Sequence, residues 1–325
     1  MFRIFCCSVA FVILSVSLAF AAPVTLKLGH IADPQNPYAR GAEKFAELVK
    51  EKTNGAVVIQ IFPSSQLGNQ RDLVEGLTFG TVDMTLSSTA VYANFVPEVG
   101  VFDLPFIFRD MEHTYKVLDT IGLETSQLGE ARGIKTLCMM ENGVRHMTNN
   151  RQPIKAPADM KGLKIRVMEQ PIYIEMMKLL DASPTPMAFG EIYTSLQKGV
   201  IDGQENPLAH ICTSRFFEVQ KYVSLTAHTY SAEPMLISMS SWKKLSADQQ
   251  AAMQAAANEA TQWQRDLCRG LEKEYVEFIN KSGKSTVNDD VDLKAFADAT
   301  RGTWALFANK TKGGQELIDR IVNTK

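Results

Sequence analysis

Residues 145–207 hold the four segments that decide the fold: Arg-His-Met-Thr-Asn (145–149), Asp-Met-Lys-Gly-Leu-Lys-Ile-Arg (159–166), Pro-Thr-Pro-Met-Ala-Phe-Gly-Glu-Ile-Tyr (184–193) and Asp-Gly-Gln-Glu-Asn-Pro (202–207). They bring two arginines, a short apolar strand and a turn into one compact stretch. An arginine presents a planar fork of donors that fits a carboxylate with two parallel hydrogen bonds. Arg166, which ends the predicted strand, is well placed to act as such a fork.

Strand and helix signals alternate outward from this stretch. The pattern predicts the order strand, helix, strand twice, at 24–29, 37–52 and 57–62 and again at 163–167, 172–180 and 184–187. This order is typical of an open α/β sheet, in which ligands bind at the carboxyl ends of the strands. Ser246 and Gln249 form a capping box, which predicts a long helix that ends near Asn280. A chain of this length exceeds one comfortable core, so we expect two domains.

Residues 1–22 have the features of a secretory signal. Arg3 precedes an apolar run from Ile4 to Phe20, and small residues follow it. We predict cleavage after Ala21 and export of the mature protein to the periplasm. An uncleaved membrane anchor of borderline length is the alternative.

Charge and cysteine content exclude several classes. Cleavage removes Arg3, so 33 of the 34 Lys and Arg residues remain. With 36 Asp and Glu residues, the net charge of the mature protein is −3. The protein therefore lacks the excess of positive charge that binds nucleic acid or anionic lipid, so an anion must be bound by a local site. Cys138, Cys212 and Cys268 would remain after cleavage, and we interpret them as core residues while leaving one disulfide pair open.

The motifs of common enzymes are missing from the sequence. It has no G-x-S-x-G, no H-E-x-x-H and no G-x-G-x-x-G, and its five histidines lack metal-ligand spacing. Gly283-Lys284-Ser285 is similar to the end of a phosphate loop, but position 278 is Phe where that motif needs Gly. We therefore predict no enzyme, no cofactor and no metal-ligating residues, and the sequence leaves any metal requirement open.

Together with Leu-Lys-Leu-Gly-His (26–30) and Phe-Pro-Ser-Ser-Gln-Leu-Gly (62–68), the segments quoted above resemble the DctP-type solute-binding proteins of TRAP transporters. The resemblance implies a two-lobed α/β periplasmic binding protein, a Venus flytrap with a long lobe-spanning helix. It also implies the lobe boundaries, which are 23–143 plus 232–271 for lobe I and 144–231 plus 272–325 for lobe II.

The resemblance also implies the ligand-binding residues. Arg166 takes the place of the arginine that pairs with the ligand carboxylate, and Asn206 that of an asparagine on the same group. The Asn206 amide would donate to the anion while neighbours hold its carbonyl. An Asx turn that leads into Pro207 is the alternative for Asn206. Arg145 either contacts the ligand or holds the lobe interface. Phe189 matches an aromatic that walls the pocket, although it could be plain core. His30 and Ser88 lie on segments that line lobe I's side of the cleft.

Glu169 departs from the sialic-acid branch of this family, which has a Pro-Asn pair where this chain has Met168-Glu169. A carboxylate three residues from Arg166 would repel a ligand anion unless it bonds a hydroxyl or an amine, or pairs with an arginine. This favours a ligand with hydroxyls beside its acid group, although Glu169 could instead point at solvent.

The expected function is therefore capture of a small organic anion and its delivery to the small four-helix subunit and the large permease of a TRAP transporter. Uronates and other sugar acids, C4-dicarboxylates and small hydroxy-sulfonates such as isethionate all fit. The alternatives are a same-fold ligand sensor and the binding protein of an ATP-driven importer.

Overall fold

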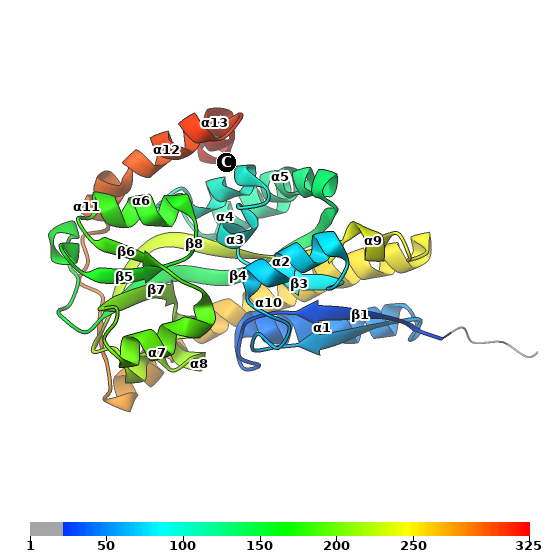
Figure 1. Ribbon diagram of the computed structural model, residues 1–325, viewed down its shortest axis with the longest axis horizontal. Coiled ribbons are helices and arrows are strands. Elements are labelled where there is room, and N and C mark those ends of the chain that lie inside the picture. Colours follow the sequence, from blue (N-terminus) through cyan, green and yellow to red (C-terminus); the bar gives the residue numbers. More distant parts are fainter. Residues whose placement is uncertain (1–21) are drawn as a thin grey trace, which may run out of the picture.

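The computed structural model describes residues 22–325, so the predicted signal segment, apart from Ala22, lies outside the described residues. Nine strands of this range form one mixed sheet in the order β2-β1-β3-β8-β4-β7-β5-β6, with β9 paired to β8 (Figure 1). The strands are β1 (Val24–Gly29), β2 (Val57–Phe62), β3 (Met84–Leu86), β4 (Ile134–Asn149), β5 (Lys164–Val167), β6 (Ser183–Pro186), β7 (Gly203–Pro207), β8 (Tyr222–Ser238) and β9 (Thr286–Asn288).

Helices cover the sheet on both sides (Figure 1). They are α1 (Pro37–Lys52), α2 (Gln70–Phe79), α3 (Thr89–Tyr92), α4 (Met111–Val117), α5 (Leu123–Ser126), α6 (Pro171–Leu179), α7 (Ile192–Gln197), α8 (Leu208–Thr213), α9 (Met239–Trp242), α10 (Ala247–Ser282), α11 (Leu293–Thr300), α12 (Gly302–Lys310) and α13 (Gly314–Asn323), with a short 3-10 helix η1 (Pro97–Asp103).

The N-terminal strand, helix and strand form as predicted. β1 and β2 pair in parallel from Val24 opposite Val57 to Gly29 opposite Phe62. The side chain of Asn36 caps α1 by accepting from the amide of Tyr38. The second predicted unit is also present as β5, α6 and β6, and β5 pairs in parallel with both β6 and β7. The ends of β5 and β7 therefore lie side by side, which is where the predicted site residues cluster.

Two long antiparallel strands, β4 and β8, run through the middle of the sheet and join its two halves (Figure 1). Their register shifts at Thr136/Cys138, Glu141/Gly143 and Arg145/Met147. Such bulges bend a strand and increase its twist. Gly143 has φ +124°, a conformation that side chains rarely adopt, so the bulge there requires glycine.

The 36-residue helix α10 confirms the long helix that the capping box predicts. Ser246 Oγ accepts from the amide of Gln249, whose side chain accepts from the amide of Ser246. The N-terminal part of α10 packs in one core with α1 through Ala256 and Ala260, and Ile279 near its end packs in another core with Phe216. The helix therefore belongs to two cores, as expected of a lobe-spanning element.

The C-terminal helices pack over the junction between the two halves. Trp304, Phe307 and Ile321 share a core with Phe102 and Leu118. α12 contacts α6, and α13 contacts η1. This segment thus touches both predicted lobes, and the division of the chain into lobes stays a prediction.

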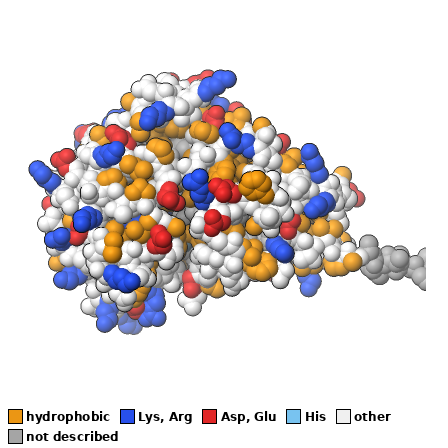
Figure 2. Space-filling view, viewed as in Figure 1, with side chains coloured by type: hydrophobic (Ala, Val, Ile, Leu, Met, Phe, Trp, Pro, Cys, Tyr) orange, Lys and Arg blue, Asp and Glu red, His pale blue; other side chains and the backbone are white. Residues whose placement is uncertain are grey.

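The three cysteines outside the signal segment, Cys138, Cys212 and Cys268, are free and buried. Within residues 22–325, no helix combines the length and the apolar character needed to cross a membrane. Charged side chains of both signs are interspersed over the face in Figure 2, which agrees with the small net charge.

Candidate functional site

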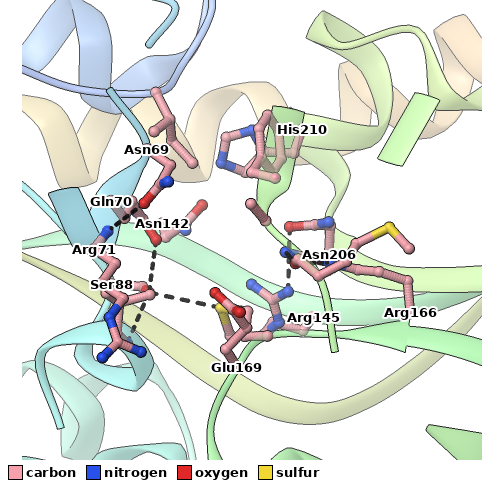
Figure 3. A pocket seen from close by; sticks show the side chains of 16 residues that line it. Asn69, Gln70, Arg71, Ser88, Asn142, Arg145, Arg166, Glu169, Asn206 and His210 are labelled. Carbon is pink, nitrogen blue, oxygen red and sulfur yellow. Dashed lines mark hydrogen bonds between the residues drawn. The ribbon is translucent and has the colours of Figure 1, made fainter. Parts of the chain in front are cut away.

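A hollow of about 490 Å³, its open mouth included, lies between the two halves of the sheet. Figure 3 shows Asn69, Gln70, Ser88 and Asn142 on one side and Arg145, Arg166 and Asn206 on the other. The first side comes from the starts of α2 and α3 and from β4. The second comes from β4, β5 and β7. Binding sites for small molecules have this mixture of apolar walls with a few convergent polar groups.

Arg166 is 3% exposed and holds its guanidinium edge-on against the backbone. Its Nε and Nη2 donate to the carbonyl oxygen of Met187 at 3.0 and 2.8 Å. Its Nη1 has no hydrogen-bonding partner within residues 22–325. Burial lowers the pKa of this guanidinium to about 10, so the group is still charged at neutral pH. The edge formed by Nη1 and the second hydrogen of Nη2 is therefore the free fork for an anion.

Asn206 lies next to this fork with its carbonyl fixed. Its Oδ1 accepts from Arg145 Nη2 at 3.2 Å, and its Nδ2 donates to Gln204 Oε1. A side-chain amide has two N–H donors, so one remains for a ligand. The predicted arrangement, in which neighbours hold the carbonyl and the amide donates to the anion, fits this geometry.

Arg145 is occupied mainly by a protein partner that the sequence reasoning missed. Its Nε and Nη2 both donate to the carboxylate of Glu205, which is fully buried, and His228 Nε2 lies 3.4 Å from the same carboxylate. Burial alone would raise the pKa of Glu205, but the charge of Arg145 and the hydrogen bonds from His228 and Arg145 together outweigh burial, and the pKa is lowered. Arg145 also lines the hollow, so ligand contact and holding the lobe interface both stay predictions for it.

An aromatic wall closes the hollow beside β7. The ring of Phe189 lies 4.7 Å from that of His210, and Phe216 packs behind Phe189 at 5.7 Å. Burial lowers the pKa of His210 to about 3, so its imidazole is neutral and acts as an aromatic surface. His210 was not predicted; its place three residues after Pro207 is the only sequence signal for it.

Ser88, Glu169 and His30 differ in their position. Ser88 lines the hollow and is buried. Glu169 lines the mouth and is exposed, and its carboxylate has no bonding partner in the described part of the chain. His30 is buried outside the lining, with its ring edge-on to Tyr38 at 5.8 Å, so the structure does not bring it together with the other six predicted residues.

Comparison with known proteins identifies the family. A family model described as bacterial extracellular solute-binding protein, family 7 (DctP) matches residues 28–311. The chain belongs to this family. The resemblance in the sequence segments is thereby confirmed, as is the two-lobed fold class with its long helix.

Family 7 relatives cover nearly the whole chain. The 2,3-diketo-L-gulonate-binding periplasmic protein YiaO of Escherichia coli is 37% identical over 94% of this chain and 93% of its own length. The C4-dicarboxylate-binding periplasmic protein DctP of Rhodobacter capsulatus is 36% identical over 79% of this chain and 76% of its own. A TRAP periplasmic solute-binding protein of Polaromonas sp. JS666, solved with D-erythronate, has a TM-score of 0.90 at 39% identity and covers 93% of this chain and 99% of that one.

Three further polar residues of this family 7 chain were missed by the sequence reasoning. Gln70 follows the quoted segment 62–68 by two positions, and Asn142 precedes Arg145 by three. Both bond Glu233, a buried carboxyl on β8. Gln70 and Asn142 could have been predicted from their proximity to the quoted segments, whereas no neighbouring motif points to Glu233.

Proposed function

We propose that this protein binds a small organic anion in the periplasm and delivers it to the membrane subunits of a TRAP transporter. The observation that carries this proposal is the free fork of Arg166, a buried cation with an unpartnered Nη1 at the edge of a hollow within the described residues. Leaving a buried donor unpaired costs about 1–3 kcal/mol, and more for a charged group. A ligand carboxylate at this position would remove that cost.

The rest of the hollow suits the carbon skeleton of such an anion. Asn206 has a spare N–H next to the fork, while Phe189 and His210 offer an apolar face. Glu169 at the mouth can accept from a ligand hydroxyl and would repel a second carboxylate. Sugar acids, C4-dicarboxylates and small hydroxy-sulfonates remain the candidate ligands. The proteins named above bind or contain diketogulonate, C4-dicarboxylates and erythronate.

The transport role is supported by family membership. Closure of the two halves would bury the ligand and desolvate its pair with Arg166, and closure is favoured only as far as ligand contacts prefer the closed state. We propose binding without chemistry, so the ligand should be released unchanged. The membrane partners would be the small four-helix subunit and the large permease.

A thermal-melt panel of the purified mature protein tests the proposal. Uronates, aldonates, dicarboxylates and hydroxy-sulfonates would each be added to the native protein and to Arg166→Ala. A ligand at a hundred times its dissociation constant stabilises the fold by about 2.7 kcal/mol, which raises Tm by several degrees. A shift with native protein that Arg166→Ala loses supports the proposal. A shift of equal size in both proteins refutes the role of Arg166.

A further inference from the structure

Glu233 on β8 is a buried carboxyl whose two oxygens both receive hydrogen bonds. Gln70 Nε2 donates to Oε1 at 3.1 Å and Asn142 Nδ2 donates to Oε2 at 3.0 Å. The donors come from α2 and β4, so one carboxylate joins two elements. Gln70 and Asn142 lie on the side of the hollow opposite Arg166 (Figure 3).

This arrangement fixes which end of each amide faces the hollow. Both amides turn their NH₂ groups toward Glu233 and their carbonyl oxygens away from it. Burial raises the pKa of Glu233 to about 8, and above that pH the ionised carboxylate, which only accepts hydrogen bonds, requires this orientation. Asn142 is 5% exposed, lines the hollow, and its Oδ1 has no partner in the described residues. Gln70 Oε1 accepts the hydroxyl proton of Ser88 at 3.2 Å.

The three side chains therefore present acceptors to the hollow, and we call them the acceptor wall: Gln70, Ser88 and Asn142. The proton of Ser88 is used within the wall, and its Oγ accepts from the amide of Val91 at 3.4 Å, so one lone pair remains for a ligand. Asn142 Oδ1 is the least satisfied of these acceptors. Arg166 supplies hydrogen-bond donors on one side of the hollow. On the other side, the acceptor wall can bond only ligand groups that donate hydrogen bonds, such as hydroxyls.

We propose that the acceptor wall selects hydroxylated monoacids, such as aldonates and uronates, whose hydroxyls donate to Asn142 and Ser88 while the acid group meets Arg166. This inference rests on the proposed function, because it assumes that Arg166 binds the acid group. A second carboxylate at the wall would meet acceptors, and at pH 8.5 it would also meet the charge of ionised Glu233. Unpaired buried acceptors and like charges both weaken binding, so diacids are disfavoured.

Arg71 is the group that could oppose this selection. It lines the same side of the hollow, but its Nε donates to Glu75 at 3.1 Å and its side chain is 57% exposed. An exposed, already paired cation contributes little to holding an anion. A diacid held by Arg71 is the competing arrangement, and the binding measurement below separates the two.

Ligand pairs that differ only at the far end provide the test. D-Erythronate and meso-tartrate share the acid group and two hydroxyl carbons, and tartrate carries a carboxylate where erythronate carries a CH₂OH group. D-Gluconate and D-glucarate form the same pair with six carbons. Binding constants for all four would be measured by calorimetry at pH 8.5 with native protein, Glu233→Gln and Asn142→Ala.

We expect native protein to prefer the monoacid of at least one pair by tenfold or more. The glutamine introduced by Glu233→Gln would offer an NH₂ to the wall, so one wall amide can turn its own NH₂ into the hollow. The preference should then fall to threefold or less. Asn142→Ala should weaken the monoacid about tenfold and leave the diacid unchanged. It also serves as the second variant if Glu233→Gln does not fold.

Two outcomes would overturn the acceptor wall and leave the proposed function standing. The diacids could bind native protein as tightly as the monoacids, or the monoacid preference could survive in both variants while Arg166→Ala abolishes binding. If no organic anion binds native protein at all, the proposed function fails and this inference fails with it.

Discussion

Arg166→Lys is the substitution that distinguishes a guanidinium fork from a simple positive charge. In the structure the carbonyl oxygen of Met187 takes Nε and one hydrogen of Nη2, which leaves Nη1 and the other hydrogen of Nη2 for a carboxylate. A lysine ammonium can replace the bond to Met187 or bond the ligand, but it cannot reproduce both edges of the fork.

The expected loss follows from the number of bonds removed. A charge-assisted hydrogen bond contributes about 1.5–3 kcal/mol, so Arg166→Lys, which keeps the charge and one bond, should weaken binding about 10- to 150-fold. Arg166→Ala removes both bonds and the charge, and should weaken binding by at least about 100-fold.

Calorimetric titration with the ligand that gives the largest melt shift measures both losses. Arg151→Lys is the matched control, because Arg151 is an exposed arginine paired with Asp202 and lies outside the lining of the hollow. Its affinity should stay within twofold of the native value. A thermal melt of each apo variant checks that the fold is intact.

The fork explanation would be refuted by an Arg166→Lys affinity within threefold of the native value. A point charge would then be sufficient for binding. An equal loss in Arg151→Lys would show that the substitution acts through the fold and not through the hollow.

Three further predictions concern stability. Burial raises the pKa of Glu233 from 4.5 to about 8, so this carboxyl holds its proton in the folded state where the unfolded chain loses it, and its stabilising contribution declines as pH rises from about 4.5 to about 8. As pH rises from 5 to 8.5, the free energy of unfolding of apo Glu233→Gln should therefore increase relative to that of native protein by up to about 4 kcal/mol. A difference in Tm between the two proteins that stays constant over this range would contradict this. Arg145→Met leaves the buried carboxylate of Glu205 unpaired and should lower the free energy of unfolding by about 3–5 kcal/mol, while the double variant with Glu205→Leu should recover part of it in denaturant titrations; no recovery would argue against the pair. Gly143→Ala places a methyl 3.2 Å from Pro207 Cβ at φ +124° and should cost about 1–3 kcal/mol. Gly270→Ala, inside α10, adds a Cβ that meets nothing within 4 Å and should instead stabilise the fold by about 0.5–1 kcal/mol.

Local patterns predicted the elements whose causes lie within a few residues. The first strand, helix and strand have the predicted bounds, and the capping box at Ser246 starts α10 where expected. The sequence did not indicate β4 and β8 as long strands that cross the sheet, because their pairing joins residues 73 to 104 positions apart and β4 contains the polar run Glu-Asn-Gly at 141–143.

The site divides in the same way. Arg166, Asn206 and Phe189, which line the hollow, could be predicted because each lies on one of the quoted segments, whereas Ser88 was predicted from the resemblance alone. The buried partners were missed, since Glu205 reaches Arg145 and Glu233 reaches Gln70 across 60 and 163 positions. A carboxyl within a strand has no local sign of the cation or amide that satisfies it, so only the fold reveals its role.

The central position of β8 also governs when the chain can fold. β8 is the only link between β3 and β4 in the sheet formed by residues 22–325, and it is made from residues 222–238. A chain that has emerged only as far as residue 221 can form the β1 and β2 pair, but its two half-sheets have no strand to join them. Long-range pairing of this kind slows folding, because the chain loses the entropy of loop closure before the stabilising strand contacts form. We therefore expect truncations before residue 238 to stay aggregation-prone, and the full chain to refold in one late, slow step after β8 is available.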